Sequence, residues 1–239
     1  ERGNAKLMIA YRLHCEPGTV EMVQRVRNGD IGEPRLFTAT FTQQTKAENH
    51  RMKSGFWAGP AADMGPYPLN AVRNLFGGEP LEVHAVGAQT PGRPINTPDT
   101  VSVTLGFAEQ RQATFTVSFS LPATERFQLI GTQGEFEASP CFGFGEGVAI
   151  AYRSIIDGEK QEHTFPVVDQ FGGETEYFSQ CILEDRQPEA DGDEGWRDVR
   201  VLAAIERSLQ TGEVQKLEPL PSRKGIQADQ ARQLPLAKV

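Results

Sequence analysis

Three segments of the chain alternate strictly between apolar residues and small polar residues. They are IGEPRLFTATFTQ from Ile31, TVSVTLGF from Thr100 and ATFTVSFS from Ala113. The apolar positions are Phe37, Ala39, Phe41, Val101, Val103, Leu105, Phe107, Phe115, Val117 and Phe119, and Thr or Ser fills the positions between them. A period of two residues places each kind of side chain on its own face of a strand. The alternation therefore predicts an open, mostly antiparallel sheet with one face on a core and a second face rich in Ser and Thr.

Helices must cover the apolar face, and the chain offers four candidate segments. They are TVEMVQRVRNG after Pro17, Pro68 to Phe76, ETEYFSQCILED from Glu174, and Glu194 to Thr211 with Trp196, Val199, Leu202 and Ile205 at helical spacing. Gly77 and Gly212 follow two of these segments directly and are typical stops. We therefore expect an α+β fold with helices on one face of the sheet, followed by an irregular C-terminal arm from about residue 219.

Composition excludes several classes of function. With 24 Lys and Arg against 32 Asp and Glu, the net charge is -8, and no basic cluster favours a nucleic-acid partner. No apolar run approaches the ~20 residues of a membrane span. The four histidines form no ligand-spaced set, and the three cysteines lie far apart, so we expect no metal and reduced thiols.

The first residues indicate that the chain is a fragment. KLMIAYR, from Lys6 to Arg12, has the pattern of a short strand, yet no turn or partner strand precedes it. The chain also opens on Glu1 without an initiator Met. We therefore expect further sequence before it, and no signal peptide can be read from this N-terminus.

A carboxylate, two prolines and a tyrosine precede one of the helices, in AADMGPYPLNAVRNLFG from Ala61 to Gly77. If the turn is helical, Asp63 and Tyr67 stand at i and i+4 and share a face. The alternative is that Asp63 caps a helix beginning near Gly65 while Tyr67 packs into the core. The residues alone leave both interpretations open.

DMGPYPLNAVRNLFGGEPLEV resembles the Asp-x-Gly-x-His/Tyr segment of the glucose-fructose oxidoreductase and inositol dehydrogenase (Gfo/Idh/MocA) family. KLMIAYRLHCEPGTVEMVQRVRNGDIGEPRLF is similar to that family's passage from nucleotide-binding domain to sheet domain, and DGDEGWRDVRVLAAIERSLQTGEVQKL to its closing helix. The resemblance implies that residues 1–14 hold the last strand of a Rossmann domain, that 15–218 form the substrate and oligomerisation domain, and that 219–239 are the arm.

The resemblance also implies chemistry. It indicates an NAD(P)-dependent oxidoreductase acting on a sugar or polyol, with the cofactor, NAD or NADP, bound mainly by an N-terminal domain. Oxidising a hydroxyl requires a base for its proton while hydride leaves the carbon, and Tyr67 is the candidate. An unperturbed Tyr has a pKa of about 10, so the phenolate needs a nearby cation, the expected role of a Lys outside this chain. Asp63 would orient that Lys or bind a substrate hydroxyl.

Four further site candidates come with structural alternatives. Arg12 and His14 lie at the end of the first expected strand, where Arg12 would bind the cofactor and His14 the substrate. Both could equally form salt bridges at a domain boundary. Trp57 would provide an aromatic platform for a sugar ring, or it is a half-buried packing residue. Asn70 would hydrogen-bond a sugar hydroxyl, or it bonds only within its own helix. Gly143, Gly145 and Gly147 imitate a dinucleotide fingerprint, which we reject because VAIAYRSII after them has the pattern of a strand.

Two classes of function follow. The first is the substrate-binding and oligomerising half of a sugar oxidoreductase, forming a homo-oligomer through the open Ser/Thr face in the cytoplasm. The second is a non-catalytic ligand-binding or oligomerising domain that kept the fold. We favour the first because both Asp63 and Tyr67 are present.

Overall fold

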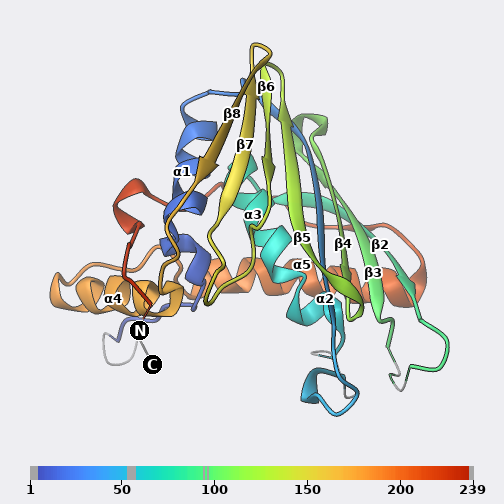
Figure 1. Ribbon diagram of the computed structural model, residues 1–239. Helices are drawn as coiled ribbons and strands as arrows, with labels where there is room; N and C mark the ends of the chain where they lie inside the picture. The colour runs from blue at the N-terminus through green and yellow to red at the C-terminus, as the bar shows by residue number, and fades with distance from the viewer. Residues whose placement is uncertain (1–4, 53–57, 94, 96, 237–239) are drawn as a thin grey trace.

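A computed structural model describes residues 5–52, 58–93, 95 and 97–236, and its centre is a nine-stranded sheet (Figure 1). The strands are β1 Pro34–Gln44, β2 Pro80–Ala88, β3 Thr100–Phe107, β4 Gln112–Ser118, β5 Ser120–Gly131, β6 Gly134–Ala138, β7 Ala151–Ile156, β8 Glu159–Thr164 and β9 Gln215–Lys216. Their order across the sheet is β8-β7-β6-β5-β1-β4-β3-β2-β9. The β1 and β4 strands pair in parallel, and the remaining neighbours are antiparallel. The open, mostly antiparallel sheet predicted from the alternation is confirmed.

The alternation also predicted which face of each of the three strands is buried. Phe37, Leu105 and Phe115 are fully buried, while Ser102 and Thr104 are exposed on the opposite face. The pattern fails at the end of β1, where Thr42 is buried and donates its hydroxyl to the Pro122 carbonyl oxygen at 2.6 Å. A register shift between β1 and β5 at this point turns the strand, which a strict period of two cannot reveal.

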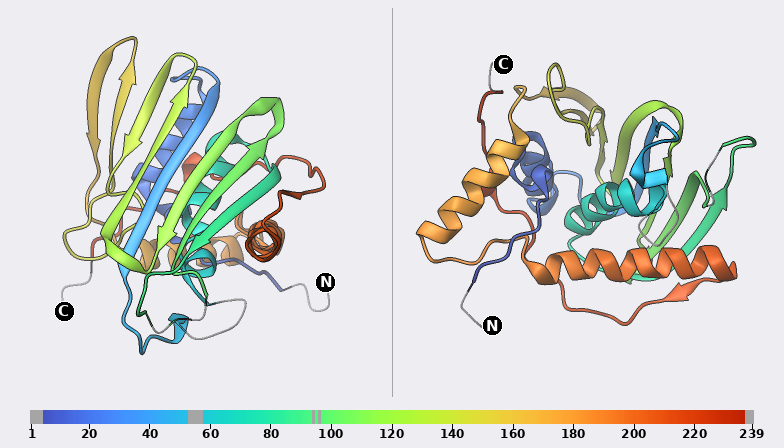
Figure 2. Two further views of the ribbon diagram at one scale, coloured as in Figure 1. Left: turned by 90° about the vertical axis from the view of Figure 1, so that its right-hand side faces the viewer. Right: turned by 90° about the horizontal axis from the view of Figure 1, so that it is seen from below.

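The helices form a layer on one face of the sheet, as the view from below shows (Figure 2). They are α1 Pro17–Arg27, α2 Pro60–Asp63, α3 Pro66–Phe76, α4 Gln170–Leu183 and α5 Gly192–Thr211, with 3-10 turns η1 Arg12–Cys15, η2 His50–Met52, η3 Ala108–Gln110 and η4 Ala228–Gln230. The α1, α3 and α5 helices cover the core, and α4 lies to one side against η1. Across the described ranges, no helix combines the length and the apolarity that a membrane crossing requires.

The buried face of α5 differs from the stripe expected from its apolar residues. Trp196 and Val199 are 51% and 40% exposed, so this part of the expected stripe is wrong. Glu194 and Asp198 take the buried positions instead, because Arg73 of α3 lies opposite and forms ion pairs with both. Hydropathy alone places carboxylates outside a core, and only a partner on another element reverses that rule.

The strand expected over residues 6–12 is absent from the described chain. Residues 5–11 lie outside any strand, and Arg12 begins η1. The segment runs over the start of α5, where Ile9 donates its backbone N–H to Ala190 at 2.7 Å. A Cβ at Gly195 would lie 2.8 Å from Cγ1 of Ile9, so the glycine permits this contact. A strand needs a neighbour to share its backbone hydrogen bonds, and this segment has a loop and a helix beside it instead.

The C-terminal arm is irregular, as expected, but it is tightly packed. Its backbone has one short 3-10 turn, η4, yet Ile226 and Gln230 are 2% and 1% exposed. Arg232 donates its N–H to Cys15 at 2.8 Å, and Leu234 accepts one from Asp169 at 2.8 Å. The arm therefore returns to the first helices and closes the core beside them.

The start of α3 depends on one glycine. Met64 and Gly65 keep a right-handed helical backbone between α2 and α3, so the two helices follow one another almost directly. A Cβ on Gly65 would lie 2.1 Å from the Ala61 carbonyl oxygen, closer than any real contact. Only a glycine allows the chain to pass this carbonyl and begin α3 at Pro66, with Tyr67 in its first turn.

We expect Gly65→Ala to lower the free energy of unfolding by about 1 to 3 kcal/mol, because the methyl group forces the α2–α3 junction apart. Chemical denaturation of the chain measures this change. Gly78→Ala, just past the other end of α3, is the control, since its Cβ would meet only Arg111 Nη2 at 3.4 Å. Equal stability losses for the two variants would show that the Gly65 contact does not shape the junction.

Candidate functional site

A cavity of about 210 Å³ lies between α1, α3 and the segment around η1. Its wall includes Tyr11, Arg12, His14, Tyr67, Asn70 and Phe142. Arg12, His14, Tyr67 and Asn70 were all expected at the site, and the structure brings these four together. Asp63 is not part of the wall, and Trp57 lies outside the described residues.

Tyr67 is a half-buried residue whose ring packs edge-on against Phe41, with centroids 5.3 Å apart. Its hydroxyl has no hydrogen-bond partner among the residues that the structure describes. The chain has four tyrosines, and the other three hydroxyls are all engaged. Tyr11 donates to Asp198 at 2.6 Å, Tyr152 donates to Glu21 at 2.6 Å, and Tyr177 accepts a backbone N–H at 3.0 Å. Tyr67 therefore presents the phenol that a ligand can reach without displacing a partner.

Asp63 belongs to the end of α2 rather than to the cavity. One carboxylate oxygen accepts a hydrogen bond from Arg51 Nε at 2.6 Å. The Asp63 side chain is 25% exposed and the Arg51 side chain is 44% exposed. The residue before α3 is Gly65, and no side chain caps that helix. The interpretation of Asp63 as an N-cap is therefore wrong. Pro66 and Pro68 lack an N–H, so α3 begins with fewer donors that need a cap.

Arg12 is buried, and its terminal nitrogens are used inside the chain. One donates to the Phe142 carbonyl at 2.5 Å, and the other to Gln170 Oε1 and to the Gly143 carbonyl at 3.3 Å. The guanidinium carbon lies 5.1 Å from the centroid of the Tyr67 ring. A bound cofactor would have to compete with these contacts, so the geometry makes Arg12 a residue that positions its neighbours.

His14 is held between two acceptors. Its Nδ1 lies 2.7 Å from Glu189 Oε2, and its Nε2 lies 2.6 Å from Asn70 Oδ1. The orientation of Asn70 is fixed because its amide nitrogen donates to Glu194 at 3.1 Å and to Asp198 at 3.3 Å. Carboxylates only accept, so the Asn70 oxygen must face His14, and His14 must donate from both nitrogens. It is therefore an imidazolium.

The electrostatics agree with this hydrogen-bond pattern. Burial opposes the charged form of His14, but the hydrogen bonds and charge of Glu189, with help from Asn70 and Glu194, outweigh it and raise its pKa. Burial also raises the pKa of Asp198 and of Glu194, against the opposing attraction of Arg73. The site thus rests on a buried set of charges that compensate one another.

Sequence reasoning missed the partners that hold His14 and Asn70. Arg73 Nη1 lies 2.8 Å from Glu194 and 2.5 Å from Asp198, and its Nε lies 2.9 Å from Glu79. One signal was available: Glu194 and Asp198 stand at i and i+4, in line with the buried Val201 and Ile205. Two carboxylates on an apolar helical stripe indicate a cation on the facing element.

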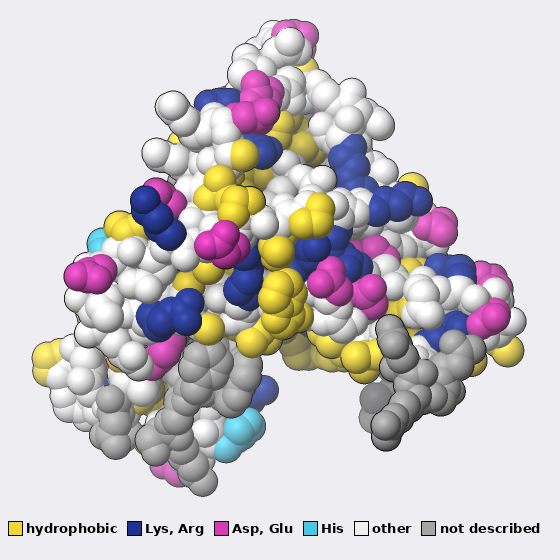
Figure 3. Space-filling view, turned by 180° about the vertical axis from the view of Figure 1, so that it is seen from behind, with side chains coloured by type: hydrophobic (Ala, Val, Ile, Leu, Met, Phe, Trp, Pro, Cys, Tyr) yellow, Lys and Arg dark blue, Asp and Glu magenta, His cyan; other side chains and the backbone are white. Residues whose placement is uncertain are grey.

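The glycine-rich stretch is not a nucleotide-binding turn. Gly143, Gly145 and Gly147 lead into β7, as the sequence indicated, and no helix begins there. Nor do three His, Cys, Asp or Glu side chains meet as a metal site within the portion of the chain that has been described. Seen from behind, hydrophobic side chains gather along the lower part of the molecule (Figure 3).

Comparison with known proteins gives consistent results. Residues 19–137 match a family model described as the GFO/IDH/MocA C-terminal domain. The D-xylose 1-dehydrogenase (NADP(+)) of Haloarcula marismortui is 28% identical over 222 residues, which cover 90% of this chain and 61% of that protein. A D-xylose 1-dehydrogenase (NADP(+)) of Haloferax volcanii is 26% identical over 220 residues, covering 91% and 66%. The chain thus spans less than two thirds of the length of either relative.

Solved structures share the fold. An aldose-aldose oxidoreductase from Caulobacter crescentus, complexed with glycerol, superposes with a TM-score of 0.82 at 28% identity, over 90% of this chain and 65% of that one. A 3-ketoreductase from Actinomadura kijaniata in complex with NADP gives a TM-score of 0.72 at 20% identity, over 87% and 62%. The second similarity concerns the fold alone.

We expect His14 to stabilise the fold in a pH-dependent way. Because its folded pKa lies above the ordinary value, its stabilising contribution is complete below about pH 6.5, the unfolded value, and is lost as pH rises through the folded pKa. The difference in unfolding free energy between wild type and His14→Gln should therefore shrink with rising pH. Denaturant unfolding at a series of pH values measures it, with His84→Gln on β2 as the control. A difference that is flat or grows with pH would mean that His14 is neutral in the folded state.

Proposed function

The chain belongs to the GFO/IDH/MocA family through its C-terminal domain, and from this membership we propose that it is the substrate-binding half of an NAD(P)-dependent sugar oxidoreductase. The substrate class is an aldose, a polyol or a related carbohydrate. Support comes from two relatives described as D-xylose dehydrogenases that use NADP(+) and from a structural neighbour described as an aldose-aldose oxidoreductase. The NADP(+) of both relatives favours NADP over NAD.

One observation carries the proposal: Tyr67 lines the cavity, and its hydroxyl has no hydrogen-bond partner among the described residues. During oxidation, a sugar hydroxyl placed ~3 Å from it would give its proton to the deprotonated phenolate oxygen, and during reduction the neutral phenol would return that proton. Arg12, whose guanidinium carbon is 5.1 Å from the ring centroid, fixes the orientation of that ring. Phe41 supports the ring edge-on, so the hydroxyl keeps one position.

The nicotinamide cofactor, when bound, accepts or donates the hydride. The described residues could contact only the nicotinamide end of the cofactor. The glycine-rich stretch leads into β7 and so forms no phosphate-binding turn, and the terminal nitrogens of Arg12 already bond within the chain. We propose that the rest of the cofactor is held by a nucleotide-binding domain, which the greater length of the relatives accommodates. Residues 1–14 would then connect the two domains.

The other expected site residues take supporting roles in this proposal. Asp63, held by Arg51, would orient a partner group from the nucleotide-binding domain or bind a substrate hydroxyl. A hydroxyl that binds His14 or Asn70 directly must compete with Glu189 and Asp198, so these two residues shape the wall. Trp57 stays a candidate platform for a sugar ring.

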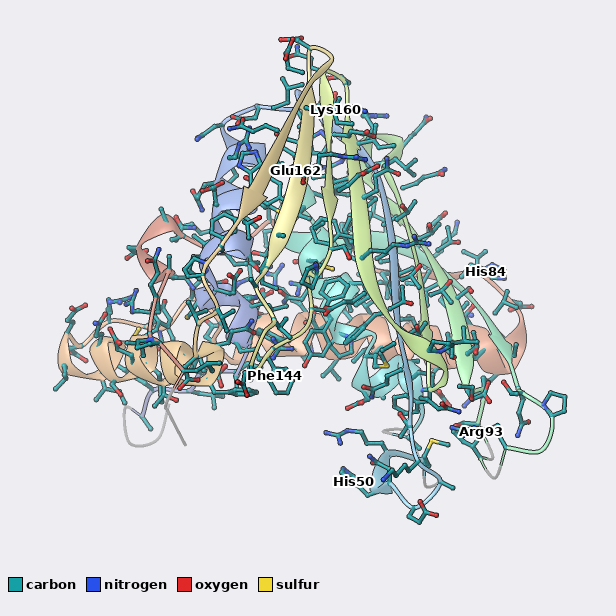
Figure 4. The ribbon with its side chains drawn as sticks, viewed as in Figure 1. His50, His84, Arg93, Phe144, Lys160 and Glu162 are labelled. Carbon is teal, nitrogen blue, oxygen red and sulfur yellow. The ribbon has the colours of Figure 1, made fainter. Side chains whose placement is uncertain are left out.

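We also propose that the open sheet face joins two copies of the chain. Two hydroxyl pairs of β3 and β4 satisfy one another: Thr100 and the buried Ser118 are 2.7 Å apart, and Ser102 and Thr116 are 2.9 Å apart. These hydroxyls therefore have less need of water. Charged residues lie instead on the side of the sheet formed by β5 to β8. Figure 4 shows Lys160 and Glu162 of β8 there, away from His84 of β2 on the other side. A paired face with a charged rim is typical of an isologous interface.

Tyr67→Phe should lower turnover about 10²- to 10⁴-fold in the protein that carries the nucleotide-binding domain, because the proton loses its acceptor. Steady-state oxidation of D-xylose and other aldoses with NADP measures the change. Cofactor affinity and melting temperature should be retained.

Tyr152→Phe is the matched control, since that hydroxyl donates to Glu21 and lines no part of the cavity. Its turnover should match the wild type. If Tyr67→Phe keeps normal turnover, Tyr67 is not the acid/base. If the wild type oxidises no carbohydrate at all, the chain is better described as a ligand-binding or oligomerising domain.

Replacing Thr104 and Thr116 together with Lys should convert the assembly to monomers, because two like charges would face their copies across the interface. Light scattering of the wild type and the double variant gives the masses. Lys substitution of Thr211, an exposed residue at the end of α5, is the control. An unchanged mass would place the assembly on another surface.

A further inference from the structure

Two phenylalanines stand exposed beside the cavity, although the other described phenylalanines are buried or half-buried. Phe144 and Phe171 are 53% and 48% exposed. Their rings meet at 89° with centroids 5.0 Å apart, a favourable edge-to-face arrangement. Phe144 lies at the lower edge of the molecule, near the start of α4 (Figure 4). Neither ring lines the cavity, but Arg12 does, and its guanidinium carbon lies 4.6 Å from the centroid of Phe144, so the pair lies beside the cavity wall.

The pair is held from beneath by Arg12. The guanidinium donates to the carbonyls of Phe142 and Gly143, immediately before Phe144, and to the side chain of Gln170, immediately before Phe171. Gln170 in turn donates to the Gly143 carbonyl at 3.1 Å. Two separate stretches of chain are thus fastened to one buried cation.

The same cation connects the pair to Tyr67. Its carbon lies 4.6 Å from the centroid of Phe144 and 5.9 Å from that of Phe171, against 5.1 Å for Tyr67. The rings are therefore preorganised at a fixed position relative to the phenol. A rigid exposed aromatic surface costs little entropy when a ligand packs on it.

We propose that Phe144 and Phe171 form a carbohydrate-stacking subsite, which binds the second sugar ring of a disaccharide or longer substrate. The inference rests on the proposed function of Tyr67. The C–H groups on one face of a sugar ring are electropositive and pack on the negative face of an aromatic ring. The cavity lined by Tyr67 would take the reacting unit, and the phenylalanine pair would contact the unit that extends out of it. The pair carries no hydrogen-bonding group, so it selects for ring size and not for a particular hydroxyl.

The subsite is tested by comparing a monosaccharide with its disaccharide in the protein that carries the nucleotide-binding domain. For Phe144→Ala and Phe171→Ala, kcat/KM should fall about tenfold for xylobiose and less than twofold for D-xylose, with cofactor KM unchanged. Leu183→Ala, 84% exposed at the far end of α4, is the control and should change neither value. An equal loss for both sugars, or no loss for either, overturns the subsite. Loss of cofactor affinity without sugar selectivity assigns the pair to a contact between domains, and also overturns it.

A binding measurement separates this inference from the proposed catalysis. Saturation-transfer NMR with xylobiose and this chain should show contact to one sugar ring, and the signal should disappear in Phe144→Ala. If contact is seen while the wild type oxidises no sugar, the function proposed for Tyr67 fails and the subsite stands. If no contact is seen while Tyr67→Phe abolishes turnover, the subsite fails and the function stands.

Discussion

The ion pairs of Arg73 hold α3 against α5. The residue is 4% exposed, and its guanidinium reaches Glu79 beyond the end of α3 and both Glu194 and Asp198 on α5. Removing one partner of such a group leaves a buried charge uncompensated, which costs far more than the pair itself contributes. The carboxylates that neutralise Arg73 also fix the Asn70 amide, whose oxygen accepts a hydrogen bond from His14. The facing helix thus adds to the effect of Glu189, which favours the charged form of His14 on the cavity wall.

The hydrogen bonds around the cavity explain why the Tyr67 hydroxyl has no partner among the described residues. Three polar neighbours on the wall have partners of their own: His14 has Glu189, Tyr11 has Asp198, and Arg12 has the Phe142 carbonyl. None of them needs the phenol. Two hydroxyls on the wall, those of Tyr67 and of Thr19, have no partner in the part of the chain that the structure describes, a feature that stability alone does not explain. It is consistent with a group kept for a ligand.

The sequence predicted the sheet better than the site, for a physical reason. Side-chain alternation is a local pattern, and it correctly assigned Phe37, Leu105 and Phe115 to the core. The site depends on contacts across long separations that no local pattern contains. Resemblance to a family led to Tyr67 and to the segment of Arg12 and His14. The carboxylate that holds His14 is Glu189, 175 residues later, and those that hold Asn70 lie on α5. The alternative that Asp63 caps α3 failed because two prolines had already reduced the need for a cap.

The position of β1 in the sheet has a consequence for how the chain acquires its fold. This early strand lies between β4 and β5, so Thr38 pairs with Thr114 on one side and with Gln128 on the other. Its parallel pairing with β4 closes a long loop before any contact compensates the lost chain entropy. During synthesis β1 cannot complete its pairing until β5 has been made, and the arm that returns to Cys15 is made later still. The domain therefore assembles late, and its unpaired strand edges are prone to aggregation in the interval.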